Sequence, residues 1–290
     1  MSITLVYLCR GKSAGLGAAE KFISHYIKYK PGCEHDFVVV FKGWSKAQDQ
    51  DKKLLKLKFR ALSAKLIELD DDGYDWAAYM RVTVMLETEF ICFLNSFSRP
   101  LGHLWLKNIY ECIKIEDVGM CGATGAYKSW RFTLPLFEFN FFSVIIYPLK
   151  VTRRIINHFS LFGYYQEKFC PHLRSNGFAI ERKRFQKFVN LASIPKNKKD
   201  CYRLESGNAS YSNYVLSLNQ RLVLVDKSGN FYDIQDWIRS KTYCCPDQPE
   251  LCIADNNTDF YDKQKVSVKR QLEFDVWGYT FDEKSLGKLE

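Results

Sequence analysis

The first hundred residues alternate between short apolar runs and segments of helical periodicity, and this alternation restricts the fold more than any other feature. Four runs rich in β-forming residues are separated by three amphipathic segments. The expected strands are Ser2–Leu8, His35–Phe41, Ala64–Leu69 and Phe90–Leu94, and the expected helices are Ala14–Tyr29, Ala47–Leu62 and a segment from Asp75 onward. Strands joined by helices pair in parallel, so this order predicts a doubly wound sheet with Rossmann-like topology.

Two of these strands end in polar turns, and a binding site is expected beside them. The third strand ends at Asp70-Asp71-Asp72-Gly73, and the fourth ends at Asn95-Ser96-Phe97-Ser98. Ligands of open α/β sheets bind just beyond the carboxyl ends of the strands. The sequence therefore predicts a pocket between Asp70–Asp75 and Asn95–Ser98.

The pattern becomes less regular in the second half of the chain. In the extended segment Phe169–Ile180, three polar residues alternate, and alternation places His172, Arg174 and Asn176 on one face. They form either a binding surface, in which Arg174 holds a phosphate, or an ordinary strand edge. Because no repeat or linker divides the sequence, we expect a single domain over residues 1–290.

The composition is that of an ordinary globular protein, with 47% hydrophobic and 26% charged residues. The formal charge of +9 favours anionic partners, although basic residues spread along the chain can equally form a solvated surface.

Ten cysteines scattered through apolar runs indicate a reducing cytoplasm, and no signal peptide is expected. The run Phe132–Leu149 is as long as a membrane span, but Glu138 and Asn140 favour a buried segment or an element on the membrane surface.

Several common motifs are incomplete. Gly11-Lys12-Ser13 lacks the first glycine of a phosphate-binding Walker loop, and Gly15-Leu16-Gly17 lacks the third glycine of a dinucleotide fingerprint. Cys244, Cys245 and Cys252 lack the paired spacing of a structural zinc site. Basic and aromatic residues do not interleave along one stripe, so nucleic acid is not expected as a partner.

Four stretches follow one another in an order that is typical of a known family. They are the first strand ending at Arg10-Gly11, DGYDWAAY at 72–79, FICFLNSFSRPL at 90–101, and HLRSNGFAI followed by LESG and IADN. Together they resemble the GT-A class of nucleotide-sugar-dependent glycosyltransferases, in particular GT-A-like proteins of bacterial surface-polysaccharide synthesis. The resemblance extends over nearly the whole chain. It implies an α/β fold with a mixed central sheet flanked by helices and a less regular C-terminal half.

The resemblance also implies roles for individual residues. Residues 1–125 would be the nucleotide-sugar-binding half and residues 126–290 the acceptor-side half. The implied contacts are Arg10, Gly11, Asp70, Asp72 and Asp75 around base and ribose, Asn95 and Ser96 at the diphosphate, and His172, Arg174 and Asn176 on the acceptor or diphosphate side. Glu205 matches an acid that, in inverting members, acts as general base on the acceptor hydroxyl.

The activity implied by this resemblance is transfer of a hexosyl or deoxyhexosyl group from a nucleotide-diphosphate donor to a hydroxyl acceptor. The acceptor would be a glycan or a lipid-linked glycan of the bacterial surface. The protein would then act in the cytoplasm or at the inner face of the membrane, with an anionic membrane surface as a further partner.

The family's metal motif carries carboxylates that bind Mg²⁺ or Mn²⁺, whereas the matching turn Asn95–Ser98 has none. Three alternatives stay open. Asp70–Asp72 or Asp255 can bind the metal, or the enzyme is metal-independent and Arg99, Arg174 or a lysine neutralises the diphosphate. In the third alternative catalysis has been lost, which leaves a non-catalytic module that binds nucleotides or sugars.

The site residues also have purely structural interpretations. Asp70–Asp72 and Glu205 each precede an expected helix, so their carboxylates can be N-terminal caps. Asn95 and Ser96 can form an inert turn.

Overall fold

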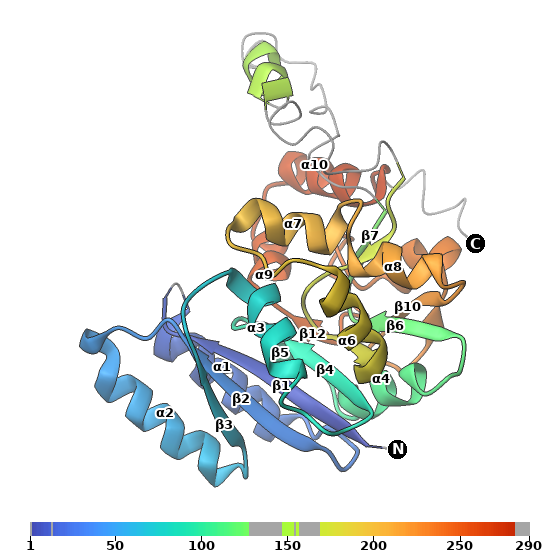
Figure 1. The fold of residues 1–290 in the computed structure, drawn as a ribbon. Helices are drawn as coiled ribbons and strands as arrows, with labels where there is room; N and C mark the ends of the chain where they lie inside the picture. The colour runs from blue at the N-terminus through green and yellow to red at the C-terminus, as the bar shows by residue number, and fades with distance from the viewer. Residues whose placement is uncertain (1, 13, 128–146, 154, 157–168, 282–290) are drawn as a thin grey trace.

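An eight-stranded mixed sheet forms the centre of the protein (Figure 1). The computed structural model describes residues 2–12, 14–127, 147–153, 155–156 and 169–281. In the order β11-β10-β6-β9-β4-β1-β2-β3, the strands are Phe231–Tyr232, Arg221–Val225, Val118–Gly122, Phe178–Glu181, Phe90–Leu94, Ile3–Arg10, Asp36–Lys42 and Lys65–Leu69. Two short pairs stand beside this sheet: β5 (Arg99–Pro100) with β12 (Ile253–Ala254), and β7 (Gly125–Ala126) with β8 (His172–Leu173).

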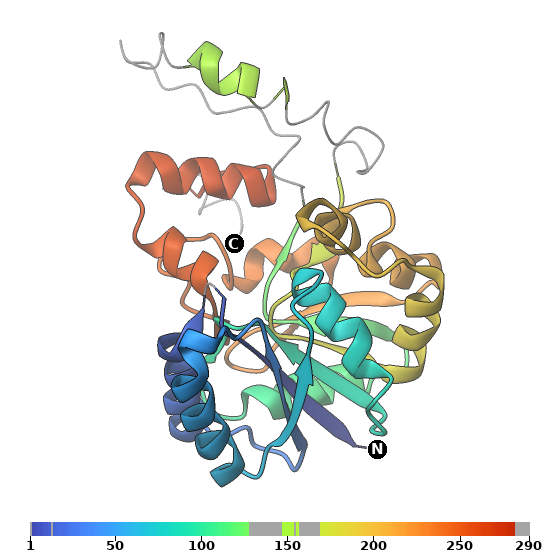
Figure 2. The ribbon, with the colours of Figure 1, turned by 60° about the vertical axis from the view of Figure 1, so that its left-hand side comes forward.

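Helices cover both faces of the sheet. The α-helices include α1 (Gly15–Lys28), α2 (Asp49–Ala61), α3 (Tyr74–Thr83), α4 (Trp105–Ile113), α6 (Arg182–Leu191), α7 (Lys198–Ser206), α8 (Tyr211–Ser217), α9 (Asn256–Asp262) and α10 (Val266–Trp277). The described residues 147–153 and 155–156 are also helical. The described residues also form the 3₁₀ helices η1 (Lys46–Gln48) and η3 (Ile234–Ser240). In Figure 2, α1 and α2 (blue) lie on one side of the sheet and α3 (cyan) lies on the other.

The alternation of side chains along β1 divides the core into two layers. Tyr7 points towards α1 and α2, where its ring stacks on Phe22 with centroids 3.9 Å apart. Its neighbours Val6 and Leu8 point to the opposite layer, which holds apolar residues of α3, α6, α8 and α10. A strand buried on both faces is therefore apolar at nearly every position, as the sequence of β1 is.

The predicted alternation of strands and helices is confirmed. Strands β3, β2, β1 and β4 are adjacent in this order and all parallel, which is the arrangement of a Rossmann-like half. β9 then lies antiparallel between β4 and β6, and this makes the sheet mixed. The α/β fold with a mixed sheet flanked by helices is thus confirmed, and so is the parallel pairing of the first four strands.

β3 is not the buried strand that its apolar sequence suggests. It is the edge strand next to β2, and its residues are half-buried or exposed. Glu68 points outward, where Lys52 and Lys56 of α2 bind its carboxylate. The edge position explains the charged residues at both exposed positions of the strand.

The second half departs from the predicted outline. The segment Phe169–Ile180 is not one extended strand, because β8 and β9 belong to different sheets and Gly177 between them has φ +65°. A side chain at Gly177 would also come within 2.9 Å of Ile253. Glu205 lies within α7, and the helix that follows it is α8, whose N-cap is Ser210.

Most of the run Phe132–Leu149 lies outside the described residues. Within the part of the chain that the structure describes, no helix is long and apolar enough to cross a membrane. All ten cysteines are described, and each is a free thiol.

Candidate active site

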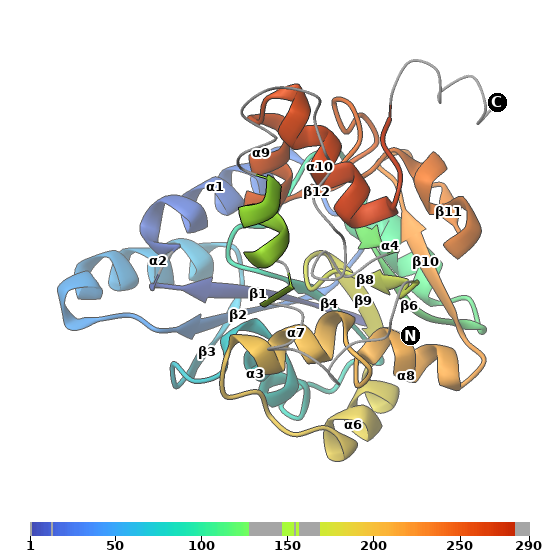
Figure 3. The ribbon, with the colours of Figure 1, turned by 90° about the horizontal axis from the view of Figure 1, so that it is seen from above.

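A cleft of about 770 Å³ opens where the carboxyl ends of β1 and β4 meet. Its walls come from the end of β1, the start of α3, the turn after β4, the segment between β8 and β9, and helices α7, α9 and α10. Seen from above in Figure 3, α7 lies on one side of β1 and β4, and α9 and α10 lie on the other.

The cleft occupies the topological switch point of the parallel strands. The chain runs outward from β1 through β2 to β3 and then returns to place β4 on the other side of β1. The carboxyl ends of the two strands diverge at such a point, which opens a crevice for a ligand. The Tyr7 hydroxyl fixes the turn after β4 by donating a hydrogen bond to the Ser96 carbonyl at 2.9 Å.

Most of the predicted site residues line this cleft. Those that do are Arg10, Asp75, Asn95, Ser96, His172, Arg174 and Glu205. Four others do not line it, namely Gly11, Asp70, Asp72 and Asn176. The structure thus brings together residues that are up to 195 positions apart in the sequence.

The acidic turn before α3 binds basic side chains of the protein itself. Asp71 accepts a hydrogen bond from Arg10 at 3.0 Å, and the Asp72 carboxylate binds Arg81. The N-cap of α3 is Gly73, without a side-chain cap, so the capping interpretation of Asp70–Asp72 is wrong. The ribose role implied for Asp70 and Asp72 is not supported, because Asp70 is exposed outside the cleft and Asp72 is paired.

Gly11 has a structural role at this end of the sheet. Its N–H donates to the Lys42 carbonyl at 2.9 Å, and an added Cβ would lie 2.7 Å from the Trp44 ring. The Trp44 ring nitrogen in turn donates to the Cys9 carbonyl. Gly11 therefore permits this close packing and does not line the cleft.

Asp75 is the acid of the turn that faces the cleft. Burial raises the pKa of its carboxyl to about 6, Arg10 and Lys42 lower that pKa, and Glu205 and Asp255 raise it. Asp75 accepts no hydrogen bond within the described part of the chain. Its two oxygens are consequently available to hydroxyl groups of a ligand.

The turn after β4 is ordered by its own side chains. The Asn95 Oδ1 atom accepts hydrogen bonds from the Phe97 N–H at 2.9 Å and from the Ser98 hydroxyl at 3.2 Å. The Ser98 hydroxyl also contacts Oδ1 of Asn176, which is buried behind the turn. Asn176 therefore supports the turn from behind, and the prediction that it shares a face with His172 and Arg174 is wrong.

Glu205 projects into the cleft from the last turn of α7. Its Oε1 atom accepts a hydrogen bond from the Ser175 N–H at 2.7 Å. Its Oε2 atom has no hydrogen-bond partner among the described residues. Since Glu205 lies near the carboxyl end of its helix, the capping interpretation is wrong for this residue too.

Arg174 and His172 complete the polar wall. The Arg174 guanidinium lies 4.2 Å from the centre of the Tyr243 ring and donates to Asp255 at 3.2 Å. Asp255 is fully buried and caps α9 by accepting hydrogen bonds from the N–H groups of Asn257 and Thr258. Burial lowers the pKa of His172, so its imidazole is neutral at pH 7.

The sequence interpretation missed the wall built by α9 and α10 and the aromatic residues of the cleft. The lining residues that were missed include the aromatic residues Tyr74, Tyr202, Tyr243 and Phe260, and also Lys198, Val268 and Leu272. One available signal was Asp255-Asn256-Asn257-Thr258, a capping box that marks the start of α9. A similar box from Asn197 to Asp200 marks the start of α7.

Most of the residues that the sequence offered for a divalent metal are already engaged in the structure. Mg²⁺ and Mn²⁺ prefer carboxylate oxygens, and the Asn95–Ser98 turn offers an amide oxygen that already accepts two hydrogen bonds. Asp71, Asp72 and Asp255 are each paired with arginine. Among the described residues, no group of three or more His, Cys, Asp or Glu side chains is arranged to hold a metal ion.

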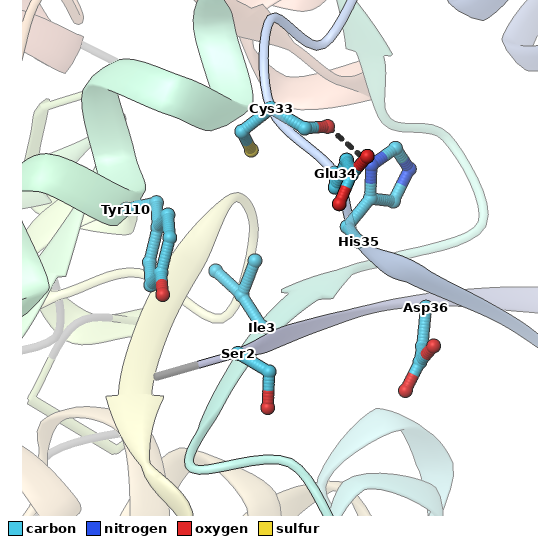
Figure 4. Close-up of a pocket in the computed structure, with 7 residues that line it drawn as sticks. All are labelled: Ser2, Ile3, Cys33, Glu34, His35, Asp36 and Tyr110. Carbon is cyan, nitrogen blue, oxygen red and sulfur yellow. Dashed lines mark hydrogen bonds between the residues drawn. The ribbon is translucent and has the colours of Figure 1, made fainter.

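A second hollow lies at the opposite end of the sheet (Figure 4). It is lined by Ser2, Ile3, Cys33, Glu34, His35, Asp36 and Tyr110. The His35 ring nitrogens already interact with the Cys33 carbonyl and the Tyr26 hydroxyl, at 2.9 and 2.8 Å. None of the predicted site residues lies there, so the cleft at β1 and β4 remains the candidate site.

Solved structures of glycosyltransferases resemble this chain. No protein-family model matches the sequence, and no curated protein matches it either. A mannosyltransferase from Pyrobaculum calidifontis in complex with GDP-Man and Mn²⁺ is 12% identical over 76% of this chain and 53% of its own, with a TM-score of 0.47. TarS from S. aureus is 17% identical over 42% of this chain and 21% of its own, with a TM-score of 0.32.

A third structure, TarS 1–349 in complex with UDP-GlcNAc, is 19% identical over 42% of this chain and 33% of its own, with a TM-score of 0.31. The chain thus spans about half or less of the length of these structures. With identities below 25% and TM-scores below 0.5, the likeness concerns the fold and carries no argument about the chemistry of this chain.

Proposed function

We propose that this protein is a glycosyltransferase that moves a sugar from a nucleoside-diphosphate donor to a hydroxyl acceptor. The observation that carries the proposal is Glu205, a carboxylate with one oxygen fixed by the Ser175 N–H and the other free to face the cleft. A carboxylate held in this way can accept the proton of an attacking hydroxyl. Fixing one oxygen reduces the reorganisation needed during the reaction.

The other lining residues divide into two sides. Arg10, Asp75 and the Asn95-Ser96 turn lie at the ends of β1, α3 and β4, where we place the donor nucleotide. Asp75 offers oxygens to ribose hydroxyls. His172 and Arg174 lie nearer the β8–β9 segment and α7, where we place the diphosphate and the acceptor.

We further propose that the acceptor is a glycan or lipid-linked glycan of the bacterial surface and that the protein works in the cytoplasm, at an anionic inner membrane face. The support is the net charge of +9, which favours anionic surfaces. Co-sedimentation with vesicles of phosphatidylglycerol should exceed that with phosphatidylcholine alone. Equal sedimentation with both would contradict the membrane proposal without affecting the transferase proposal.

Calorimetric titration and transfer assays test the main proposal. UDP-, GDP- and dTDP-sugars should be titrated with and without Mn²⁺, and at least one should bind. Replacement of Glu205 by Gln should abolish transfer, a loss of about a hundredfold or more, but leave donor affinity within about threefold. The transferase proposal fails if no donor binds, and the general-base role fails if Glu205→Gln turns over at the parent rate.

A second candidate is a non-catalytic module that binds nucleotides or sugars in the same cleft. It is favoured by the lack of an acid in the Asn95–Ser98 turn. Donor binding without transfer or hydrolysis, unchanged by Glu205→Gln, would identify this module. Transfer that Glu205→Gln abolishes would exclude it.

A further inference from the structure

Three basic side chains reach the cleft, and each lies over the ring of a tyrosine that also lines it. The three pairs are Arg10 over Tyr74 at 5.2 Å, Arg174 over Tyr243 at 4.2 Å, and Lys198 over Tyr202 at 5.5 Å, measured to the ring centroids. We call Arg10, Arg174 and Lys198 the tyrosine-backed cations. The three pairs come from separate parts of the chain. Arg10 ends β1 and Tyr74 begins α3, Arg174 lies between β8 and β9 and Tyr243 in the loop before β12, and Lys198 and Tyr202 both belong to α7.

A tyrosine ring fixes a cation without cancelling its charge. The face of the ring attracts the cation through its quadrupole and carries no net charge, whereas a carboxylate partner offsets part of the cation's charge. Arg10 and Arg174 also have carboxylate partners, Asp71 and Asp255. These partners engage only some of the N–H groups and leave others for a ligand.

The free N–H groups can be identified from the hydrogen bonds. Arg10 uses Nε and Nη2, both towards one oxygen of Asp71, so its Nη1 is free within the described residues. Arg174 uses Nη2 towards Asp255 and Nη1 towards the Thr124 hydroxyl, which leaves Nε. Lys198 has no carboxylate partner among the described residues.

We propose that the tyrosine-backed cations neutralise the diphosphate of the donor in place of the divalent metal that GT-A enzymes normally use. This inference rests on the proposed transferase function. In the transfer step, the bond between the anomeric carbon and the β-phosphate oxygen breaks, and its electron pair stays on that oxygen. The acceptor oxygen bonds to the anomeric carbon and its proton passes to Glu205, so the departing nucleoside diphosphate carries the added negative charge.

Fixed cations suit this step. A guanidinium matches phosphate oxygens with parallel hydrogen bonds, and its planar shape packs on an aromatic ring. Cations already held in position stabilise developing charge without reorganisation. The cleft supplies such cations, whereas the turn at the position of the family's metal motif supplies no carboxylate.

Calorimetry with the intact protein tests the inference. UDP, GDP and dTDP and their parent nucleosides are titrated in EDTA and in MnCl₂, at low and high ionic strength. We expect the preferred diphosphate to bind in EDTA with an affinity within about threefold of that in MnCl₂, and to weaken as salt rises. Binding that requires Mn²⁺ would overturn the inference and leave the transferase proposal intact, whereas no binding of any nucleotide would overturn both.

Single replacements test which basic side chains bind the diphosphate. Arg10→Gln and Lys198→Gln should each weaken diphosphate binding by about tenfold to a hundredfold and leave nucleoside binding within about threefold. The matched control is Lys28→Gln, because Lys28 lies 4.9 Å over the Tyr29 ring at the end of α1, outside the cleft. Arg174 is left in place, since its removal would strand the fully buried Asp255 carboxylate.

Arg10→Lys distinguishes the loss of a positive charge from a disturbance of the fold, because it keeps the charge. It should recover most of the diphosphate affinity lost in Arg10→Gln, and circular dichroism should show the same fold for all variants. Diphosphate affinities of Arg10→Gln and Lys198→Gln equal to that of the parent would overturn the inference. Equal losses of diphosphate and nucleoside binding would also overturn it, because they would indicate a disturbed cleft and not a lost charge.

Discussion

Asp75 shows how strongly the surroundings of one residue alter its chemistry. Its carboxyl is partly buried in the cleft, and this burial raises its pKa to about 6. An acid whose pKa is higher in the folded chain than in the unfolded chain opposes folding when it is ionised. That cost is fully present above pH 6 and fades as the pH falls from 6 towards the unfolded pKa of about 4.

Replacement of Asp75 by Asn should therefore stabilise the folded protein at pH 7.5, by an amount on the order of 2 kcal/mol. The gain should fall to a small fraction by about pH 4, where the unfolded parent is half protonated, and disappear by about pH 3, where the parent carboxyl is protonated in both states. Thermal unfolding of both proteins across this pH range measures the effect. A gain that is equal at pH 4 and pH 7.5 would contradict the raised pKa.

Lys42 is a second residue whose role depends on burial. Its side chain is 2% exposed, and its ammonium donates hydrogen bonds to the backbone carbonyls of Asp72 and Tyr74. Lys42→Met keeps the length and removes both hydrogen bonds, so we expect a loss of about 1–3 kcal/mol in the free energy of unfolding. Urea denaturation measures it, with Lys53→Met as the exposed control, for which a loss below about 0.5 kcal/mol is expected.

Local sequence identified some of these residues and not others. Asp75, Asn95 and Ser96 follow predicted strands closely, so the rule for strand ends located them. Asp70 and Asp72 satisfy the same rule, but Asp72 binds Arg81 and Asp70 points to solvent, and neither orientation can be inferred from spacing. Lys42 was missed because a lysine at a strand end usually reaches solvent.

At the scale of elements, Gly73 sets how closely α3 approaches the loop before α7. It has φ +59°, and an added Cβ would lie 2.0 Å from the Pro195 carbonyl oxygen. This approach brings Asp75 of α3 and Glu205 of α7 into one cleft. A larger residue at position 73 would push the two elements apart.

Gly73→Ala should lower the free energy of unfolding by about 2–4 kcal/mol, because it combines strained backbone with overpacking. Gly17→Ala is the matched control: Gly17 lies within α1, and its added Cβ would meet nothing within 4 Å. That control should gain about 0.5–1 kcal/mol. Urea denaturation of both variants compares them, and a neutral Gly73→Ala would show that the Pro195 contact is dispensable.

The elements that the sequence predicted well are those of the first half, where long apolar strands and amphipathic helices alternate. The helices α6, α7, α9 and α10 were not predicted. α7 and α9 are short, with nine and seven residues, and α10 has weak helical periodicity, whereas the amphipathic pattern of α6 was present in the sequence and was missed. Their positions depend on packing against the sheet and on capping residues such as Asn197 and Asp255.

At the scale of the whole molecule, β9 connects the two halves of the chain. It comes from residues 178–181 but lies between β4 and β6 and is hydrogen-bonded to both. Local patterns predict strands and their order along the chain, but a strand inserted between two earlier ones depends on contacts across about ninety residues. This insertion was therefore not predictable from the alternation.

A fragment of residues 1–125 should fail to fold by itself, because β4 and β6 would both lack their shared neighbour. The full chain should instead unfold in a single cooperative transition, as expected for one domain. Near-ultraviolet circular dichroism of the fragment and thermal unfolding of the full chain measure this. A fragment with a cooperative transition near that of the full chain would show two independent domains.

The ten free thiols have a consequence for the lifetime of the protein. Eight are buried, and burial raises the pKa of Cys9, Cys92 and Cys121, so the reactive thiolate is scarce while the chain is folded. Unfolding would expose these thiols, and under oxidising conditions exposed thiols can form disulfides that prevent refolding. We therefore expect the protein to lose its fold irreversibly sooner in air than in the presence of a reductant.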